Sequence, residues 1–388
     1  MIYITVRQSP KTRQITLEDI LRGEVPLPNP ASREPMTATL TYKTEAPSEA
    51  LVRLYDIPSI IKSLTDFNRA NAQLFEAERS SLYHTYYIPK HSGGLRRIDE
   101  PNPALMAALR DLKSIFETRC RALYHTSAFA YVKGRSTLDS IKKHQQNQSR
   151  WFLKTDFSNF FGSTTFEFTV RMFSMIFPFS EVMKDKLGAQ QLQKALSLCF
   201  LNEGLPQGTP ISPTITNLMM IPIDHALVNG LRANKFVYTR YADDILVSHR
   251  FAFDHRKTVE YIDGVLASFN APFRIKPQKT RYGSSAGSNW NLGVMLNSDN
   301  DITIGYKRKR ELKAMLHNFV TDCQTNVVWD IHDVQVMSGL ISYYKMVEPQ
   351  YIKEFIPWFN RKHGVNVMLM IKRMLKGEKP LRKEEVLR

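Results

Sequence analysis

Apolar residues recur with two different periods along this chain. Helical spacing runs through residues 57–82 and again through 105–123, which predicts two amphipathic helices. Between them, residues 86–89 and a second run ending at Pro101 are rich in residues that favour strands. A basic, glycine-containing segment, 90–97, connects the two runs, so we expect an antiparallel strand pair with a basic turn.

The centre of the chain alternates short strands with helices, and the part after it is helical. Expected strands are 151–155, two within 236–248, 273–275, 291–296 and 302–304, and expected helices are 211–227, 259–269 and several beyond residue 306. The glycines at Gly283 and Gly287 predict a hinge. This order indicates an α+β body followed by a small helical module.

The first part of the chain, residues 1–56, lacks a clear period and is interrupted by several prolines. We therefore expect an N-terminal extension and not an independent domain. The body is predicted to span residues 57–300, and the helical module with a basic tail residues 301–388.

Charge and cysteine content narrow the class of protein. The 388 residues include 53 Lys and Arg against 37 Asp and Glu, a net charge of +16, which favours a polyanionic partner. We expect a nucleic acid and no membrane, because there is no run of about 18 apolar residues and no signal-peptide core. Cys120, Cys199 and Cys323 lie far apart without CxxC spacing, which predicts buried thiols in a reducing cytoplasm.

Two adjacent carboxylates, Asp243 and Asp244, lie where the expected hairpin within 236–248 turns. Like charges side by side are costly to bury unless a cation compensates them. A rigid strand pair suits a divalent metal, and Asp156, at the end of the expected strand 151–155, is the natural third carboxylate. All-oxygen ligands favour Mg²⁺. An ordinary surface turn, where Asp-Asp is common, is the alternative.

Three segments resemble the signature motifs of one family of polymerases. Tyr241-Ala242-Asp243-Asp244 is similar to the YxDD motif of reverse transcriptases, and residues 154–161 are similar to their first catalytic segment. Residues 204–213, GLPQGTPISP, resemble the LPQGxxxSP segment that lies between those two. The resemblance covers roughly residues 85–300. It implies a right-hand polymerase, with fingers and palm in 57–300 and a helical thumb after them.

The resemblance implies nucleotidyl transfer with two metal ions. In the family, two Mg²⁺ ions, which Mn²⁺ can replace, bind the residues that correspond to Asp156 and Asp243, while Asp244 is the weaker, supporting carboxylate. Phe161 matches an aromatic gate under the sugar that rejects ribonucleotides, whereas Phe160 is expected to belong to the core.

The same resemblance implies further contacts to substrate and nucleic acid. Lys279 matches a lysine that can protonate departing pyrophosphate, although an exposed lysine would look the same. The residues expected to contact the nucleotide are Lys90, Arg96, Arg97, Phe161, Gln207, Gly208 and Tyr241. Those expected to contact nucleic acid are Lys133, Arg135, Lys307, Arg308, Lys309 and Arg310. For the turn 90–97, a solvated basic loop is the alternative.

The chain is similar to bacterial retron reverse transcriptases and to the related defence-associated group. Retron enzymes carry Asn-Ala-x-x-His and Val-Thr-Gly elements, where this chain has SIKKH at 140–144 and NLG at 291–293. These departures favour the defence-associated group. Either group implies a non-coding RNA template, deoxynucleoside triphosphates, a DNA product and a role against phages. Open alternatives are a retron product of RNA-linked DNA, template-independent or protein-primed synthesis, an RNA-dependent RNA polymerase, and a non-catalytic nucleic-acid scaffold.

Overall fold

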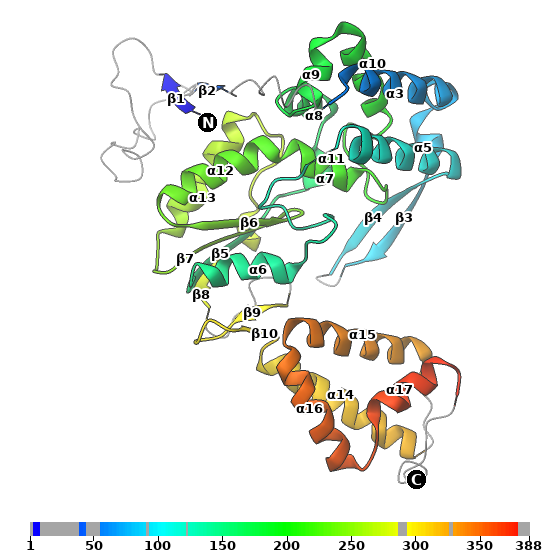
Figure 1. The fold of residues 1–388 in the computed structure, drawn as a ribbon, viewed down its shortest axis with the longest axis vertical. Helices are drawn as coiled ribbons and strands as arrows, with labels where there is room; N and C mark the ends of the chain where they lie inside the picture. Colours follow the sequence, from blue (N-terminus) through cyan, green and yellow to red (C-terminus); the bar gives the residue numbers. More distant parts are fainter. Residues whose placement is uncertain are drawn as a thin grey trace. The chain divides into compact units, whose positions relative to one another are not determined.

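The computed structural model describes residues 3–7, 39–43, 55–90, 93–121, 123–285, 293–325 and 329–378. The chain divides into two units (Figure 1). The first comprises Met1–Arg135, Leu153–Val247 and Phe253–Tyr282, and the second comprises Ser136–Phe152, Ser248–Ala252 and Gly283–Arg388. The three aspartates singled out in the sequence all lie in the first unit.

A four-stranded sheet runs in the order β6-β7-β5-β8. Its strands are β5 (Trp151–Asp156), β6 (Val237–Tyr241), β7 (Asp244–His249) and β8 (Arg281–Ser284). The predicted β6–β7 hairpin is confirmed, and the middle residues of both strands are buried. The predicted strand 273–275 is wrong, because only Ile275 forms an isolated bridge, to Phe157, before Pro277 begins the short helix η3 (Pro277–Lys279).

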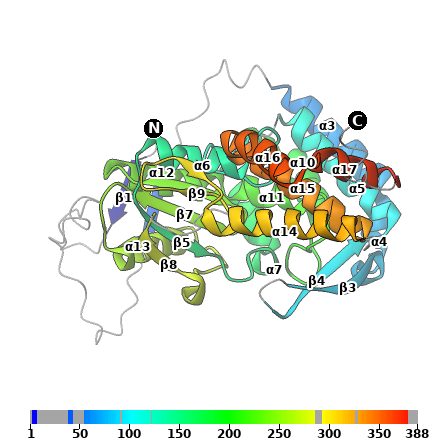
Figure 2. The ribbon, with the colours of Figure 1, turned by 90° about the horizontal axis from the view of Figure 1, so that it is seen from below.

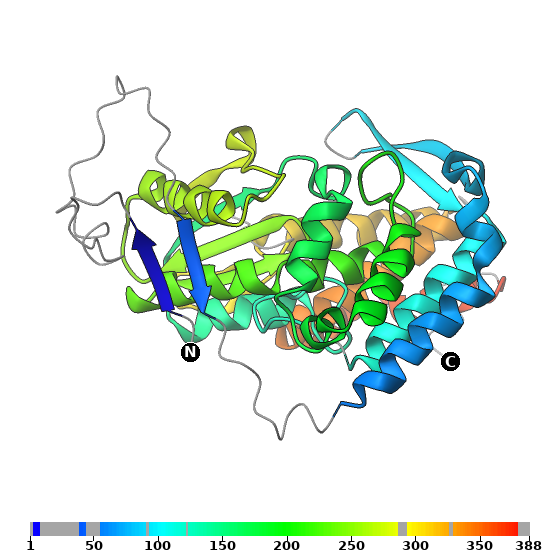
Figure 3. The same ribbon diagram turned by 90° about the horizontal axis from the view of Figure 1, so that it is seen from above.

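The first unit is otherwise mainly helical. Its helices are α3 (Ile57–Ala70), α4 (Ala72–Glu76), η1 (Arg79–Leu82), α5 (Pro103–Ser114), η2 (Ile115–Arg119), α7 (Phe160–Ser163), α8 (Phe166–Phe173), α9 (Phe179–Lys184), α10 (Lys186–Ser197), α11 (Ser212–Met219), α12 (Ile221–Ala233) and α13 (His255–Ser268). The predicted helix 211–227 is two helices, because Pro222 in the first turn of α12 lacks the N–H that would continue α11. Helix α3 packs along α10 and lies beside α5, as the blue and cyan helices of Figure 3 show.

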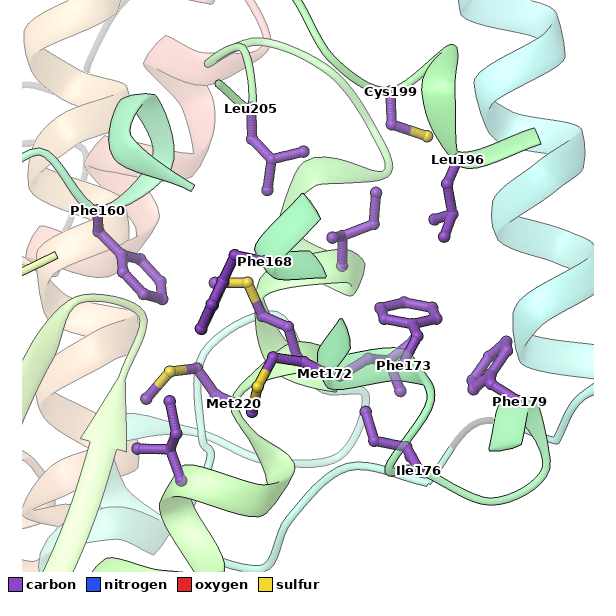
Figure 4. Close-up of a cluster of buried hydrophobic side chains, with 14 of the residues drawn as sticks. Phe160, Phe168, Met172, Phe173, Ile176, Phe179, Leu196, Cys199, Leu205 and Met220 are labelled. Carbon is purple, nitrogen blue, oxygen red and sulfur yellow. The ribbon is translucent and has the colours of Figure 1, made fainter. Parts of the chain in front are cut away.

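Aromatic side chains fill much of the core of the first unit. Figure 4 shows Phe173 of α8 near Phe179 of α9 and Leu196 of α10, with Phe168 of α8 on the side of the cluster towards Phe160. The rings of Phe173 and Phe179 lie 4.7 Å apart between centroids. Each side chain of this size gains roughly 1.5–3 kcal/mol from burial. Phe160 of α7 belongs to the same cluster, so the core extends to the residues that follow Asp156.

An exposed hairpin projects from the helices of the first unit. Its strands β3 (Tyr83–Pro89) and β4 (Leu95–Pro101) pair antiparallel with Tyr86 opposite Ile98, as the sequence predicted. Several apolar side chains remain exposed, among them Tyr87 at 58% and Leu95 at 61%. In the basic turn, residues 91 and 92 lie outside the described residues.

The second unit is a helical module with a short hairpin (Figure 2). Its elements are α6 (Thr137–Gln146), β9 (Met295–Leu296), β10 (Ile302–Thr303), α14 (Tyr306–Gln324), α15 (Ile331–Val347), α16 (Pro349–His363) and α17 (Val367–Leu375). Helix α15 packs against α16 and α17, and α6 packs against β9 and β10. The helical character of this region is confirmed. The C-terminal segment of this unit begins at Gly283, within the predicted hinge, whose Gly287 lies outside the described residues.

The predicted division into extension, fingers with palm, and thumb at residues 56 and 300 stays a prediction. Within the predicted extension, β1 (Tyr3–Arg7) and β2 (Thr39–Lys43) form an antiparallel pair.

The cysteines are free thiols. Cys120 and Cys199 are fully buried, and Cys323 is partly buried. Burial raises the pKa of Cys120 to about 12 and that of Cys323 to about 11, and it also raises the pKa of Cys199. In the part of the chain that the structure describes, no helix is both long enough and apolar enough to cross a membrane.

Candidate active site

The ends of β5 and of the β6–β7 hairpin bring two carboxylates into one site. Asp156 is the last residue of β5, and Asp243 lies in the turn between β6 and β7. The amide of Phe157 donates a hydrogen bond of 3.2 Å to the carbonyl of Asp243, which joins the two ends directly. Asp156 is only 5% exposed. The structure thus unites the aspartates that the sequence singled out.

The site is a cluster of carboxylates with two ammonium groups. Burial raises the pKa of Asp243, and the negative charges of Asp156 and Asp244 raise it further. Nζ of Lys279 contacts Oδ2 of Asp156, and Nζ of Lys154 lies 3.2 Å from Oδ1 of Asp244. Burial alone would lower the pKa of Lys279, but its hydrogen bond to Asp156 and the surrounding carboxylates raise it above the usual value. Lys279 therefore carries its proton at neutral pH.

Asp156 and Asp243 are the donors that suit a divalent cation. Proteins bind Mg²⁺ through one or two carboxylates, and water and substrate phosphates complete its ligands. Within the described residues, no three His, Cys, Asp or Glu side chains gather closely enough to share one ion. Asp244 instead pairs with Lys154. The donor set therefore fits a cation held by two carboxylates, with Asp244 beside them.

A buried arginine, which the sequence analysis overlooked, supports the turn that carries Asp243. Ala242 has a φ of +58°, in the left-handed region that residues with a Cβ rarely adopt. Its carbonyl accepts a hydrogen bond of 3.0 Å from Nη1 of Arg240, a side chain with 0% exposure. The same guanidinium forms an ion pair of 2.8 Å with Asp224 of α12. The sequence did carry a signal for this pair, because Arg240 lies in an apolar strand and Asp224 in an apolar helix. Charges buried in such elements must be paired.

The two phenylalanines after Asp156 differ in their environment. Phe160 is 3% exposed and belongs to the core, as expected. Phe161 is partly buried, and its carbonyl accepts a hydrogen bond of 3.0 Å from the amide of Leu205. Gly204 packs so closely here that a Cβ would lie 2.3 Å from the carbonyl oxygen of Gly162. These contacts fix the backbone around Phe161.

The turn at Gln207 and Gly208 is held by the β3–β4 hairpin. The amide of Asp99 donates a hydrogen bond of 2.7 Å to the carbonyl of Gln207. Gly208 has a φ of +124°, and a Cβ there would lie 2.8 Å from the carbonyl oxygen of Asp99. The sequence predicted a nucleotide contact for this glycine. In the structure, the backbone that approaches it closely is that of β4.

The arginines of β4 have different neighbours. Arg97 donates from Nε to Oδ1 of Asp99 at 2.8 Å, so its charge is already compensated within the hairpin. Arg96 lies near Tyr131, whose pKa is raised by the partial burial of its ring and by Asp243 and lowered by Arg96. Tyr131 is 62% exposed and has a φ of +58°. Arg96 and Asp243 therefore both act on one exposed tyrosine of strained backbone conformation.

Of the remaining predicted cations of the first unit, two are exposed and one is hydrogen-bonded within the fold. Lys90 and Lys133 are exposed. Arg135 is engaged inside the fold, because its Nη1 donates to the carbonyl of His125 at 2.5 Å and to that of Ala128 at 2.7 Å. The contacts of Arg135 are those of a residue that holds a loop, so Lys133 is the better candidate for a phosphate contact.

The basic residues at the start of α14 likewise include two exposed side chains and two that contact other parts of the protein. Lys307 and Arg310 are exposed. Arg308 donates to a backbone carbonyl at 2.7 Å, and Nζ of Lys309 lies 2.5 Å from a carboxylate oxygen of Glu348. Lys307, whose ammonium lies 3.9 Å from Glu311 on the solvent-exposed surface, and Arg310 are therefore the two whose side chains can turn to a nucleic-acid backbone.

Residues 88–321 match the model of the family described as reverse transcriptase (RNA-dependent DNA polymerase). The chain belongs to the reverse transcriptase family. It is therefore an RNA-directed DNA polymerase, as the three motifs predicted, and the expected α+β right-hand polymerase fold is confirmed. The matched segment contains Asp156, Asp243, Asp244 and Lys279.

Several similar proteins of known name are retron reverse transcriptases. This reverse transcriptase is 29% identical over 318 residues to the retron Ec83 reverse transcriptase of Escherichia coli, covering 78% of this chain and 94% of that protein. It is 26% identical over 285 residues to the retron Ec73 reverse transcriptase of Escherichia coli, covering 71% and 85%. The expected resemblance to the retron and defence-associated group is confirmed. The relatives named here are retron enzymes, although this chain departs from the retron elements at 140–144 and 291–293.

Among solved structures, apo telomerase from Candida tropicalis, truncated from its C-terminal domain, is similar with a TM-score of 0.43. It is 13% identical, and the match covers 58% of this chain and 55% of that chain.

Proposed function

We propose that this reverse transcriptase joins deoxynucleotides at Asp156 and Asp243, with Asp244 as a supporting carboxylate. The observation that supports this is the hydrogen-bonded junction of β5 with the β6–β7 turn, which holds the carboxylates in one charged cluster. Asp156 and Asp243 would hold two Mg²⁺ ions, which Mn²⁺ can replace, and the bound ions supply positive charge where the transferred phosphate becomes more negative.

Other residues of the first unit bind and orient the nucleotide. Arg96 suits a triphosphate because its planar guanidinium presents paired donors to phosphate oxygens, and Lys90 is a second exposed cation nearby in the hairpin. The ring of Phe161 would exclude a ribose 2′-hydroxyl. Lys279 holds a proton that it can donate to departing pyrophosphate. Nucleotide contacts from Arg97, Gln207, Gly208 and Tyr241 remain predictions.

The template in this proposal is a non-coding RNA, copied into complementary DNA. Lys133 in the first unit, and Lys307 and Arg310 in the second, would contact the sugar–phosphate backbone, where charge and not sequence is recognised. Because the relatives are retron enzymes, we expect the DNA to stay linked to RNA. Defence against phages is the biological role that we propose for this synthesis.

The test begins with the full chain purified from cells together with its bound nucleic acid. Labelled deoxynucleotides and Mg²⁺ are added, and both the bound RNA and the new DNA are sequenced. Asp243→Asn serves as the inactive variant. Asp299→Asn, an identical change at an exposed position of the second unit, serves as its matched control.

The wild type and Asp299→Asn should make DNA complementary to one bound RNA, and Asp243→Asn should bind that RNA without making DNA. A linkage that survives denaturation but not ribonuclease treatment would support the retron-type product. Synthesis by Asp243→Asn would overturn the proposed site. DNA with no counterpart among the bound RNAs would favour template-independent synthesis. Loss of protection from phage in Asp243→Asn, but not in Asp299→Asn, would tie synthesis to defence.

A further inference from the structure

Arg240 has the largest fully buried side chain in the part of the chain that the structure describes. Its guanidinium meets Asp224 through three hydrogen bonds, from Nε to Oδ1 at 2.9 Å and to Oδ2 at 3.2 Å, and from Nη2 to Oδ2 at 2.8 Å. Asp224 is also 0% exposed. Desolvating two charges costs about as much as their attraction returns, so a buried ion pair is weak evidence for stability alone. Its remaining contacts point to another role.

The other side of the guanidinium reaches the backbone around the site. Nη1 donates to the carbonyl of Ala242 at 3.0 Å and to Oδ1 of Asn217 at 3.2 Å. Nδ2 of Asn217 then donates to the carbonyl of Ala130 at 2.8 Å. Each carbonyl belongs to the peptide group directly before a residue of the site, Asp243 in one case and Tyr131 in the other. The two peptide planes are thus tied to one buried group.

Both of these backbone positions need such support. Ala242 and Tyr131 each have a φ of +58°, a conformation that costs residues with a Cβ free energy unless the surroundings impose it. The backbone reinforces the tie, because the amide of Arg240 donates to the carbonyl of Ser127 at 2.7 Å and its carbonyl accepts from the amide of Phe129 at 2.9 Å. The segment before Tyr131 is therefore fastened to β6 at several points.

We propose that Arg240, Asp224 and Asn217 are positioning residues, which set Asp243 and Tyr131 relative to one another so that a nucleotide bound at Arg96, beside Tyr131, meets the carboxylate in register. The proposal rests on the proposed role of Asp243. Arginine suits the task because its planar fork can serve Asp224, Asn217 and Ala242 at once. A lysine ammonium can satisfy Asp224 but has no second, rigidly placed donor for the turn.

Three variants separate positioning from simple stabilisation. Arg240→Lys keeps the buried positive charge and releases the Ala242 carbonyl. Asn217→Ala releases the Ala130 carbonyl. Tyr238→Phe is the matched control, because Oη of Tyr238 donates to Oδ1 of Asp224 at 2.8 Å but contacts neither carbonyl. Each full-length variant is assayed on a primed RNA for kcat and for the KM of a deoxynucleoside triphosphate, and its melting temperature is measured.

Arg240→Lys should lower kcat by about 10- to 100-fold with little change in KM, because a small misplacement of a reacting group has that effect. Asn217→Ala should raise KM by about 3- to 10-fold with a smaller effect on kcat, as the loss of one orienting hydrogen bond predicts. Tyr238→Phe should melt at a lower temperature and keep both constants within about twofold.

The proposal fails if the losses of kcat follow the losses of melting temperature across the three variants, or if Asn217→Ala keeps the wild-type KM. Should Arg240→Lys not fold, the comparison of Asn217→Ala with Tyr238→Phe still decides. Asp243→Asn distinguishes an error in the proposed catalytic site from an error in the proposed positioning role. If it is active, the proposed catalytic site is wrong. If it is inactive while Arg240→Lys behaves like Tyr238→Phe, only the positioning role is wrong.

Discussion

Nζ of Lys154 lies 3.2 Å from Oδ1 of Asp244, and the two side chains are 19% and 26% exposed. Partial burial makes this pair stronger than a fully solvated one, whose contribution is at most about 1 kcal/mol. A cation that binds at the cluster therefore meets a carboxylate whose charge Lys154 already offsets.

Replacing this lysine should make cation binding easier. In Lys154→Gln, Asp244 loses its ammonium partner, so the negative potential of the cluster increases. We expect the Mg²⁺ concentration for half-maximal synthesis to fall by about fivefold, the equivalent of ~1 kcal/mol. Lys184→Gln, which removes an exposed lysine paired with Glu181, should leave that concentration unchanged. A higher Mg²⁺ requirement in Lys154→Gln would mean that Lys154 serves the substrate phosphates instead.

Asp243 should be a residue whose loss abolishes activity but stabilises the fold. Its folded-state pKa is raised above that of the unfolded chain, so the ionised carboxyl opposes folding at neutral pH and this effect disappears as the pH falls through the folded-state pKa. Without Mg²⁺, Asp243→Asn should therefore melt above the wild type near neutral pH, by about 2 °C for each 1 kcal/mol. The difference should vanish near pH 4, the usual pKa of about 3.9.

Melting curves of Asp243→Asn and the wild type between about pH 4 and neutral pH test the sign of the predicted difference in melting temperature. Asp299→Asn should show no such difference. A wild type that melts above Asp243→Asn at neutral pH, in the absence of divalent ions, would contradict the direction of the pKa shift.

Phe161 should control the choice of sugar. In Phe161→Val, the smaller side chain leaves room for a 2′-hydroxyl, so the preference for deoxynucleotides over ribonucleotides should fall by at least about tenfold, or ~1.4 kcal/mol. Phe160→Leu is the control, because this change in a buried ring should lower the melting temperature without altering the preference. Competition between a deoxynucleotide and its ribonucleotide in single-nucleotide extension gives the ratio. An unchanged ratio in Phe161→Val would remove the gate from the proposed site.

The exposed and engaged cations of α14 should behave differently towards salt. Lys307→Gln and Arg310→Gln should each weaken RNA binding and reduce the slope of log K against log salt by about 1, since each phosphate contact releases counterions. Lys309→Gln should instead lower stability, because it removes the ion pair between Lys309 and Glu348 and leaves that carboxylate only its hydrogen bonds from Thr303 and Ile304. Binding titrations at several salt concentrations measure the slope. Equal slopes in the wild type and both exposed variants would place the nucleic acid elsewhere.

Local pattern was enough to predict the elements that carry the carboxylates. The alternation around Asp243 and the apolar run before Asp156 have the period of strands, and both segments form strands. The motif resemblance then joined them into one site. Residues 273–275 show the limit of such patterns, because three extended residues cannot reveal whether a partner strand exists.

The support of the site could not be read from local pattern. Arg240 is 16 residues from Asp224 and 23 from Asn217 along the chain, and nothing within a short window indicates which charges will meet. The close packing of Gly208 against the backbone of Asp99 could not be read from the sequence for the same reason. Arg135 is a residue type that often contacts phosphate, yet its guanidinium donates hydrogen bonds to the nearby carbonyls of His125 and Ala128.

The native cysteines allow local unfolding of this enzyme to be measured through their reaction with thiol reagents. Thiol reagents attack the thiolate, so two fully buried thiols with raised pKa values, Cys120 and Cys199, should react only when the first unit opens. Cys323, in the second unit, is only half-buried and does not need unfolding to react, so it serves as an internal reference. Pulse alkylation followed by peptide mass spectrometry can therefore time the opening of the first unit, without any engineered label, with RNA bound or removed.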